Sequence, residues 1–256
     1  MIDFLDTNPT KQDFHMHTIF CDGKDTPEDM VLSAIEKGLE RVGICIHSIL
    51  PDYEFTGIKK ELAFKQTVTE LKEKYKDKIK VYCGLERDYY TDQITDGGFD
   101  YVIGAVHILV ANGKSYLVDS SKQDFIDGVN EGFSGDCYAY IEEYYRCVAD
   151  VVEKTKCDFI AHVDLVSKFN EDNDLFDENH PRYVKAYRDA VDKLVKYNIP
   201  FEINLGAISR GYRTQPYPLP PVLEYIKKKG GKFILSSDSH TKENVAYMYD
   251  IWKKLL

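Results

Sequence analysis

The sequence has no apolar run that approaches the roughly 18 residues of a membrane-spanning helix. Its amino terminus also lacks the basic head that opens a signal peptide. Basic residues are not in excess either, because 33 Lys and Arg stand against 43 Asp and Glu, a net charge of −10 at pH 7. A nucleic-acid backbone requires a basic face, so we expect neither a membrane nor a nucleic acid as partner. A small phosphorylated substrate stays open, because bound divalent metals reverse the local sign of the charge.

The six cysteines include no C-x-x-C pair; they are Cys21, Cys45, Cys83, Cys137, Cys147 and Cys157. This usage predicts free, mostly buried thiols in a reducing cytoplasm and argues against a disulfide framework. Cys21 lies close to the candidate metal ligands described below. We prefer the interpretation of a buried thiol over that of a soft metal ligand at this position.

Motifs for a protein nucleophile are also missing, since the sequence contains neither G-x-S-x-G nor a P-loop. What it does contain is a series of metal-ligating side chains, each just past a short apolar run. Six of the seven histidines follow this rule, and so do two carboxylates. These residues are His15, His17, His47, Glu86, His107, His162, Asp238 and His240.

Short apolar runs of this kind are typical of buried parallel strands. In a barrel or a doubly wound sheet, the carboxyl ends of such strands meet on one face, where active sites lie. The pattern therefore indicates a multinuclear metal site, and imidazole with carboxylate suits Zn, Fe, Mn or Ni. Such ions lower the pKa of bound water from about 15.7 toward about 7, which supplies hydroxide for an in-line phosphoryl displacement.

At 256 residues and 43% hydrophobic content, the chain suits one large α/β domain over residues 1–256. We expect strands at 13–17, 42–46, 80–85, 101–106, 159–161, 201–204 and 233–236. We expect helices at 27–38, 58–76, 138–155, 182–196 and 221–229, and a last helix from about Glu243. Seven strands, each leading to a helix or loop, predict a (β/α)7 barrel. The segment 119–136 has loop composition, and its length is typical of a lid or a binding element.

The motifs occur in order from about residue 13 to residue 240. They are Asp13-Phe-His15-Met-His17-Thr with Asp22-Gly23, His47, Gly84-Leu-Glu86, Gly104-Ala-Val-His107, Ala161-His162-Val-Asp164 and Ser237-Asp238-Ser-His240. Together they resemble the polymerase and histidinol phosphatase (PHP) superfamily. Within it, Glu202-Ile-Asn204, Arg210-Gly211 and Gln215-Pro-Tyr-Pro218 are similar to the histidinol-phosphate phosphatase branch. The resemblance implies a distorted, seven-stranded, TIM-like barrel with two or three divalent ions, of Zn, Fe or Mn.

The resemblance also implies a role for each motif residue. The first ion would be held by His15, His17, Glu86 and Asp238, the second by Glu86, His107 and His162, and the third by Asp22, His47 and His240. A hydroxide held between the ions at Glu86, Asp238 and His240 would attack phosphorus. Arg210 would contact the substrate phosphate, and Lys168 could be a second contact.

Several of these residues have a plain structural alternative. Asp22 precedes Gly23, and Asp-Gly is first of all a turn signal. By composition alone Arg210 is a solvated loop residue, and we interpret Arg87 and Arg213 as surface charges. The seventh histidine, His180, precedes Pro181 and is expected at the entry of a helix.

Two other motif residues have open roles. Asp164 could orient His162 through its other ring nitrogen or cap a turn. Tyr217, in the Pro-rich segment, could close over a substrate ring.

The leading hypothesis is a metal-dependent phosphomonoesterase that hydrolyses L-histidinol phosphate in histidine biosynthesis. One alternative is a PHP phosphoesterase for another small ester, such as a nucleotide, a sugar phosphate or a phosphotyrosine peptide, and a substrate panel would separate the two. Another is a non-catalytic metal-binding module, which would contain metal without turning over any phosphoester. The sequence does not determine the oligomeric state.

Overall fold

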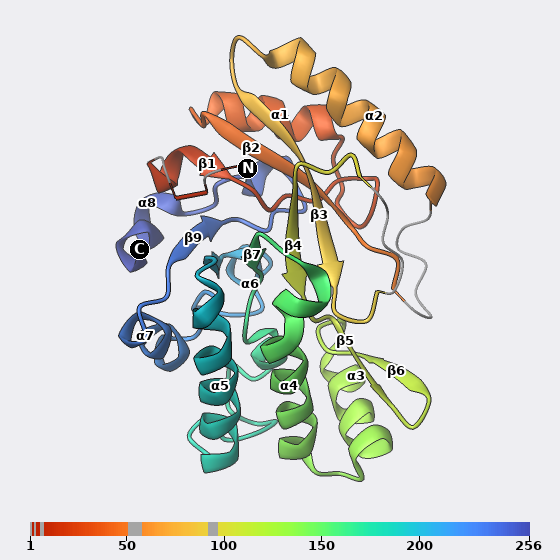
Figure 1. The fold of residues 1–256 in the computed structure, drawn as a ribbon, viewed down its shortest axis with the longest axis vertical. Helices are drawn as coiled ribbons and strands as arrows, with labels where there is room; N and C mark the ends of the chain where they lie inside the picture. The colour runs from red at the N-terminus through yellow and green to blue at the C-terminus, as the bar shows by residue number, and fades with distance from the viewer. Residues whose placement is uncertain (1, 3, 6–7, 51–57, 92–96) are drawn as a thin grey trace.

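The computed structural model describes residues 2, 4–5, 8–50, 58–91 and 97–256. Its centre is a sheet of seven parallel strands in the order β1-β2-β3-β4-β7-β8-β9 (Figure 1). The strands are β1 (Gln12–Asp13), β2 (Arg41–His47), β3 (Lys80–Asp88), β4 (Tyr101–Ala105), β7 (Phe159–Ile160), β8 (Phe201–Asn204) and β9 (Phe233–Ser236). A parallel bridge between Met16 and Ser239 brings the two edges together, so the sheet forms a nearly closed barrel. The predicted seven-stranded α/β barrel is confirmed.

The strands fall where the apolar runs predicted them, but two differ in length by several residues. Strand β3 continues to Asp88, beyond its predicted end at residue 85. Strand β1 ends at Asp13, whereas the prediction extended it to His17. Beyond Asp13 the chain pairs with the segment after β9: the amide of His17 donates to the carbonyl of Ser239 at 2.8 Å. The side chain of Asp13 adds to this contact, because it accepts hydrogen bonds from the amide and the hydroxyl of Ser237.

The helices cover the outside of the barrel (Figure 1). The principal ones are α1 (Pro27–Glu36), α2 (Ile58–Tyr75), α4 (Cys137–Thr155), α5 (Pro181–Leu194) and α7 (Pro220–Lys228). Helix α1 begins with a capping box between Thr26 and Asp29. His180 caps α5 and accepts a hydrogen bond from the amide of Arg182 at 3.2 Å, which confirms its predicted place at a helix entry.

Among the helices, the prediction is least accurate for the last one. In place of one helix from Glu243, the chain forms a 3₁₀ turn (Lys242–Asn244), a short α8 (Tyr249–Trp252) and a final 3₁₀ turn (Lys253–Leu255). Ala246 and Met248 have φ values of 50° and 51°, and this left-handed backbone interrupts the helix.

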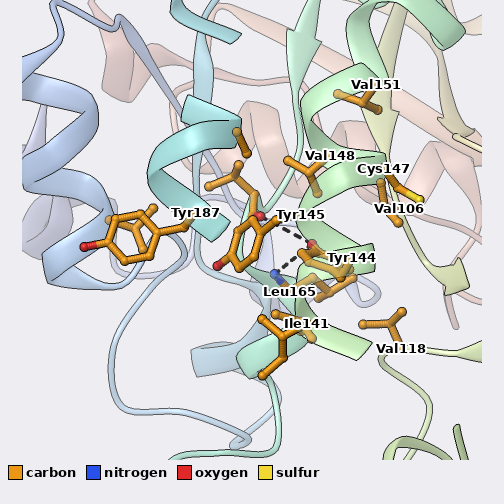
Figure 2. Close-up of a cluster of buried hydrophobic side chains, with 14 of the residues drawn as sticks. Val106, Val118, Ile141, Tyr144, Tyr145, Cys147, Val148, Val151, Leu165 and Tyr187 are labelled. Atoms are coloured by element: carbon orange, nitrogen blue, oxygen red, sulfur yellow. Dashed lines mark hydrogen bonds between the residues drawn. The ribbon is translucent and has the colours of Figure 1, made fainter. Parts of the chain in front are cut away.

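A cluster of buried apolar side chains joins α4 to the barrel and to α5 (Figure 2). Tyr144 lies at its centre and is 1% exposed. Its hydroxyl accepts a hydrogen bond from the amide of Leu165 at 3.1 Å and donates to the carbonyl of Val163 at 3.4 Å. The cluster thereby fixes the backbone that follows His162.

The region after β4 departs most from the prediction. An antiparallel hairpin of β5 (Ile108–Ala111) and β6 (Lys114–Leu117) follows His107, and it was not predicted. The segment 119–136, predicted to be a loop, contains α3 (Lys122–Asp127) and a turn of π-helix (Gly128–Gly132). Ser121 caps α3 by accepting from the amide of Asp124. Elements this short show no clear periodicity, so they look like a loop in the sequence.

Among the residues that the structure describes, no helix is long and apolar enough to span a bilayer. All six cysteines are free, as their spacing predicted. Four of them are buried: Cys45, Cys83, Cys147 and Cys157.

Candidate metal centre

The predicted metal ligands lie at the carboxyl ends of the barrel strands, on one face. His47 and Glu86 are direct register partners on β2 and β3. His107 and His162 follow β4 and β7, while Asp238 and His240 follow β9. Residues that are more than 200 positions apart in the sequence therefore share one pocket, as the strand-end pattern predicts.

Glu86 is the centre of this pocket and is 1% exposed. Its Oε1 lies 3.2 Å from Nε2 of His107 and 3.1 Å from Nε2 of His162. Its Oε2 lies 3.2 Å from Nε2 of His15 and 3.1 Å from Nε2 of His17. Nδ1 of His47 lies 3.0 Å from the same Oε2. The two carboxylate oxygens thus face different sets of imidazoles, as expected of a carboxylate that is shared between two ions.

Donor atoms gather into compact groups around Glu86. Four groups have all their donor atoms within 4.8 Å of one another: His15–His17–Glu86, His47–Glu86–His107, His17–Asp238–His240 and His17–Cys21–Asp22–His47. Asp22 has an exposed side chain but is not simply a turn residue. Its Oδ1 lies 3.4 Å from Nε2 of His47, and its Oδ2 lies 3.0 Å from Nε2 of His240.

Two carboxylates behind the donors were not identified as functional from the sequence. Glu202, on β8, is fully buried, and its Oε1 lies 2.6 Å from Nδ1 of His15. Its Oε2 accepts the amide of His162 at 3.0 Å. Asp88, on β3, accepts the amide of His107 at 2.6 Å. Oδ2 of Asp88 also lies 3.4 Å from Nδ1 of His107, so both carboxylates orient imidazoles. Asp88 ends β3, a strand-end signal that could have revealed it, whereas Glu202 lies inside β8.

The buried Glu86 carboxylate and the imidazoles around it shift one another's pKa. Burial alone would raise the pKa of Glu86, but His15, His107 and His47 hold it well below its usual range. Burial opposes protonation of His107, yet the charge of Glu86 raises the pKa of that imidazole to about 10. Protonated imidazoles therefore compensate the charge of the buried carboxylate in the places where divalent ions would supply positive charge.

One buried atom supports the fit to metal ions directly. Oε2 of Glu86 accepts no hydrogen bond from the part of the chain that the structure describes, although nitrogens of His15, His17 and His47 lie 3.0–3.2 Å away. These atoms lie close enough together to share an ion, and imidazole with carboxylate is a donor set that suits Zn, Fe or Mn.

Arg210, at the end of α6 (Gly206–Ser209), reaches into the same pocket. Its Nη2 donates to Oδ2 of Asp238 at 3.1 Å, and its Nη1 donates to Nδ1 of His240 at 2.6 Å. A Cβ on Gly206 would lie 2.4 Å from Oδ2 of Asp238 and 2.7 Å from Nη2 of Arg210. Only glycine leaves room for the guanidinium at this point.

A cavity of about 280 Å³ opens above the donor atoms. Its floor includes Glu86 and His162, and its walls include Arg210, Lys168 and Asp119. Lys168 is buried, and its Nζ contacts the backbone oxygen of Asp119 at 2.6 Å and Oδ2 of that residue at 3.1 Å. Both cations that the sequence proposed as phosphate contacts thus line the cavity.

Three other sequence interpretations need correction. Arg213 is not a surface charge: it is 7% exposed, and its Nε lies 3.1 Å from Glu171. Asp164 is fully buried, and the contact that its side chain makes is with the amide of Leu219 at 2.7 Å. Tyr217 is 1% exposed and does not line the cavity. These contacts join distant parts of the chain, so no local pattern indicates them.

Arg87 was also interpreted as a surface charge and is instead half-buried. It donates to the backbone carbonyl of Thr155 at 3.3 Å. This contact links the end of β3 to the end of α4.

The chain is similar to several known proteins over most of its length. It is 28% identical over 90% of its residues to a histidinol-phosphatase from Lactococcus lactis, of which the match covers 84%. It is 25% identical over 93% of its residues to a protein from Deinococcus radiodurans named as a probable histidinol-phosphatase, of which the match covers 89%.

Two solved structures share the fold. A histidinol phosphatase candidate from Listeria monocytogenes matches with a TM-score of 0.83 at 20% identity, over 94% of this chain and all of the other. A histidinol phosphate phosphatase from Lactococcus lactis, in complex with zinc, L-histidinol and phosphate, matches with a TM-score of 0.68 at 24% identity, over 96% of this chain and 94% of the other. The family model of the PHP domain matches residues 13–205, well over half of the sequence. The chain therefore belongs to the PHP family, a conclusion that its ordered motifs and its barrel both support.

Proposed function

We propose that this protein is a metal-dependent phosphomonoesterase that hydrolyses L-histidinol phosphate to L-histidinol and phosphate. One observation carries the proposal: Glu86 is shared between two sets of imidazoles at the floor of a cavity that also contains Arg210. The relatives named histidinol-phosphatase cover 90% or more of the chain and support this substrate over other phosphate esters.

Divalent ions in this pocket would activate water and neutralise the charge that develops on the phosphoryl oxygens. The residues of the chain would have separate roles in holding these ions. His15, His17 and Asp238 would hold one ion, and His107 and His162 a second, with Glu86 between the two. Glu202 would keep Nε2 of His15 directed at its ion, because its carboxylate would accept a hydrogen bond from Nδ1–H of that imidazole.

Arg210 would orient the substrate. A planar guanidinium donates two parallel hydrogen bonds to a phosphate, which fixes its orientation for in-line attack. Nη1 and Nη2 already point toward the end of β9, where Asp238 and His240 lie. The outer group of Asp22, His47 and His240 would hold the third ion on the same side.

The test is phosphate release by the purified protein supplied with Mn, Zn or Fe. We expect L-histidinol phosphate to be hydrolysed far faster than glycerol phosphate or 4-nitrophenyl phosphate. Glu86→Gln should abolish turnover, whereas Glu61→Gln, which alters a buried glutamate on α2, should retain it. Equal rates on all esters would indicate a phosphoesterase of other specificity, and bound metal without any turnover would indicate a non-catalytic module.

A further inference from the structure

Cys21 lies beside the outer group of proposed metal ligands. It is half-buried, whereas the sequence favoured a buried thiol at this position. One donor atom from each of His17, Cys21, Asp22 and His47 lies within 4.8 Å of the other three. A thiol, a carboxylate and imidazoles at this spacing are a donor set that one zinc ion accepts.

The turn that follows His17 directs Cys21 back toward that imidazole. The amides of Cys21 and Gly23 both donate to the carbonyl of Thr18, at 2.9 Å and 3.1 Å. A Cβ on Gly23 would lie 2.5 Å from the backbone carbonyl of His17, so this close approach requires glycine. Sγ of Cys21 thereby lies 3.4 Å from Nδ1 of His17.

The two ring nitrogens of His17 face different partners. Nε2 faces Oε2 of Glu86 at 3.1 Å, on the side of the inner ions, and Nδ1 faces Cys21. His15 has the same arrangement, because Oε1 of Glu202 lies 2.6 Å from its Nδ1. A sulfur atom that accepts from Nδ1 would therefore fix the tautomer of His17, as Glu202 would for His15.

A buried oxygen also faces this group. Glu86 is 1% exposed, and within the described residues its Oε2 accepts no hydrogen bond. Nδ1 of His47 lies 3.0 Å from this oxygen, and Nε2 of the same imidazole lies 3.4 Å from Oδ1 of Asp22. His47 thus lies between the buried carboxylate and the group that contains Cys21, and a cation bound there would compensate the charge of both carboxylates.

Cys21 approaches the outer group from another side than a substrate would. Asp22, His47 and His240 line the cavity, whereas Cys21 is not among its lining residues. A sulfur ligand would therefore complete the donor set from behind. The side that faces the cavity would stay open, as a catalytic zinc site requires.

We propose that Cys21 is a thiolate ligand of the outer ion, together with Asp22, His47 and His240, and makes this position selective for zinc over manganese. A thiol that binds a divalent ion releases its proton to solvent, and the bound sulfur would accept a hydrogen bond from Nδ1–H of His17. A soft thiolate favours zinc, whereas manganese prefers oxygen ligands. This inference rests on the metal centre of the proposed function and assigns a ligand that was not part of it.

The first experiment replaces the ions of the purified protein with cobalt(II), which reports bound sulfur through an intense charge-transfer band in the near ultraviolet. The wild type should develop this band to a plateau at one sulfur-bound ion per chain. Cys21→Ser should lack the band. It should also bind one zinc ion more than about 10-fold more weakly, since loss of even an outer partner of a ligand has an effect of that size.

The control is Cys137→Ser, because Cys137 is also half-buried but begins α4. This variant should retain the band. A wild-type protein that binds cobalt without the band would overturn the proposal, and so would a band that persists in Cys21→Ser.

A second measurement uses the wild type alone. The protein is loaded with manganese and then receives one equivalent of zinc. X-ray absorption at the zinc edge should show sulfur at about 2.3 Å, beside nitrogen and oxygen at about 2.0–2.2 Å. Zinc surrounded by nitrogen and oxygen alone would contradict both the ligand and the selectivity.

Neither measurement requires turnover, so this inference and the proposed function can fail separately. Sulfur bound to metal in a protein that hydrolyses no phosphate ester would support the Cys21 ligand and contradict the proposed function. Hydrolysis of L-histidinol phosphate by a protein whose ions have no sulfur ligand would give the opposite result.

Discussion

Replacement of Glu202 by glutamine tests whether a carboxylate behind the donors prepares them for metal. Both oxygens of Glu202 are in use: Oε1 faces Nδ1 of His15 at 2.6 Å, and Oε2 accepts the amide of His162 at 3.0 Å. Oε2 also accepts from Nδ2 of Asn204 at 2.9 Å. Glutamine offers one oxygen and one NH₂ group, so one of the two sides must lose its acceptor.

The magnitude follows from that geometry. If the NH₂ group faces His15, the proton moves to Nε2 and blocks the nitrogen that lies nearest Glu86. If it faces His162, two N–H groups oppose each other in a buried place. A buried donor without a partner costs about 1–3 kcal/mol, which corresponds to about 5- to 150-fold in affinity. This range agrees with the roughly 10- to 100-fold effect typical of residues that orient metal ligands.

The assay is competition for zinc with a chromophoric chelator at pH 8, with thermal unfolding followed in parallel. We expect Glu202→Gln to bind at least one ion about 10- to 100-fold more weakly than wild type while it still unfolds cooperatively. The matched control is Glu61→Gln, because Glu61 is also a buried glutamate but is paired with Lys65 on α2. Wild-type zinc affinity in a folded Glu202→Gln protein would refute the reasoning.

Three further predictions concern the same pocket. Glu86→Gln should reduce the bound metal, measured by elemental analysis, by more than one ion per chain, because its two oxygens face separate groups of imidazoles; loss of a single ion would contradict the bridging role. The Glu86 carboxylate outweighs burial and raises the pKa of His107 to about 10, so metal must displace protons at pH 7–8 and bind more weakly as the pH falls. Calorimetry in buffers of different ionisation enthalpy should detect this release, and a result of zero protons would count against it. Gly206→Ala should displace both Arg210 and the Asp238 carboxylate that it contacts, and should raise KM for the phosphate ester about tenfold or more; an unchanged KM would show that Arg210 does not bind the ester.

The sequence predicted the barrel and the convergence of the donors because both depend on a local signal. A short apolar run followed by a histidine or a carboxylate identifies a buried strand and its carboxyl end together, as at His47 and Glu86. Arg213 is a residue whose environment a local sequence signal does not predict. Its partner Glu171 lies 42 positions earlier in the chain, so nothing near Arg213 distinguishes it from a solvated arginine.

The hairpin of β5 and β6 is a different case, because a local signal was present. Asn112 and Gly113 have φ values of 52° and 74°, as a two-residue turn between antiparallel strands requires. Asn-Gly between two apolar segments is a strong hairpin signal, and it could have shown that the chain after His107 folds back. Asp119 would then have been expected near that histidine.

The closure of the barrel has a consequence for how the protein resists unfolding. Met16 and Ser239, which join the first and last strands, lie between the residues proposed as metal ligands at both ends of the chain. An ion bound by His15, His17 and Asp238 would cross-link segments that are more than 200 residues apart in the sequence. Neither terminal segment could then detach from the barrel without the other. Removal of the ion should therefore expose both ends to proteases before the central strands open.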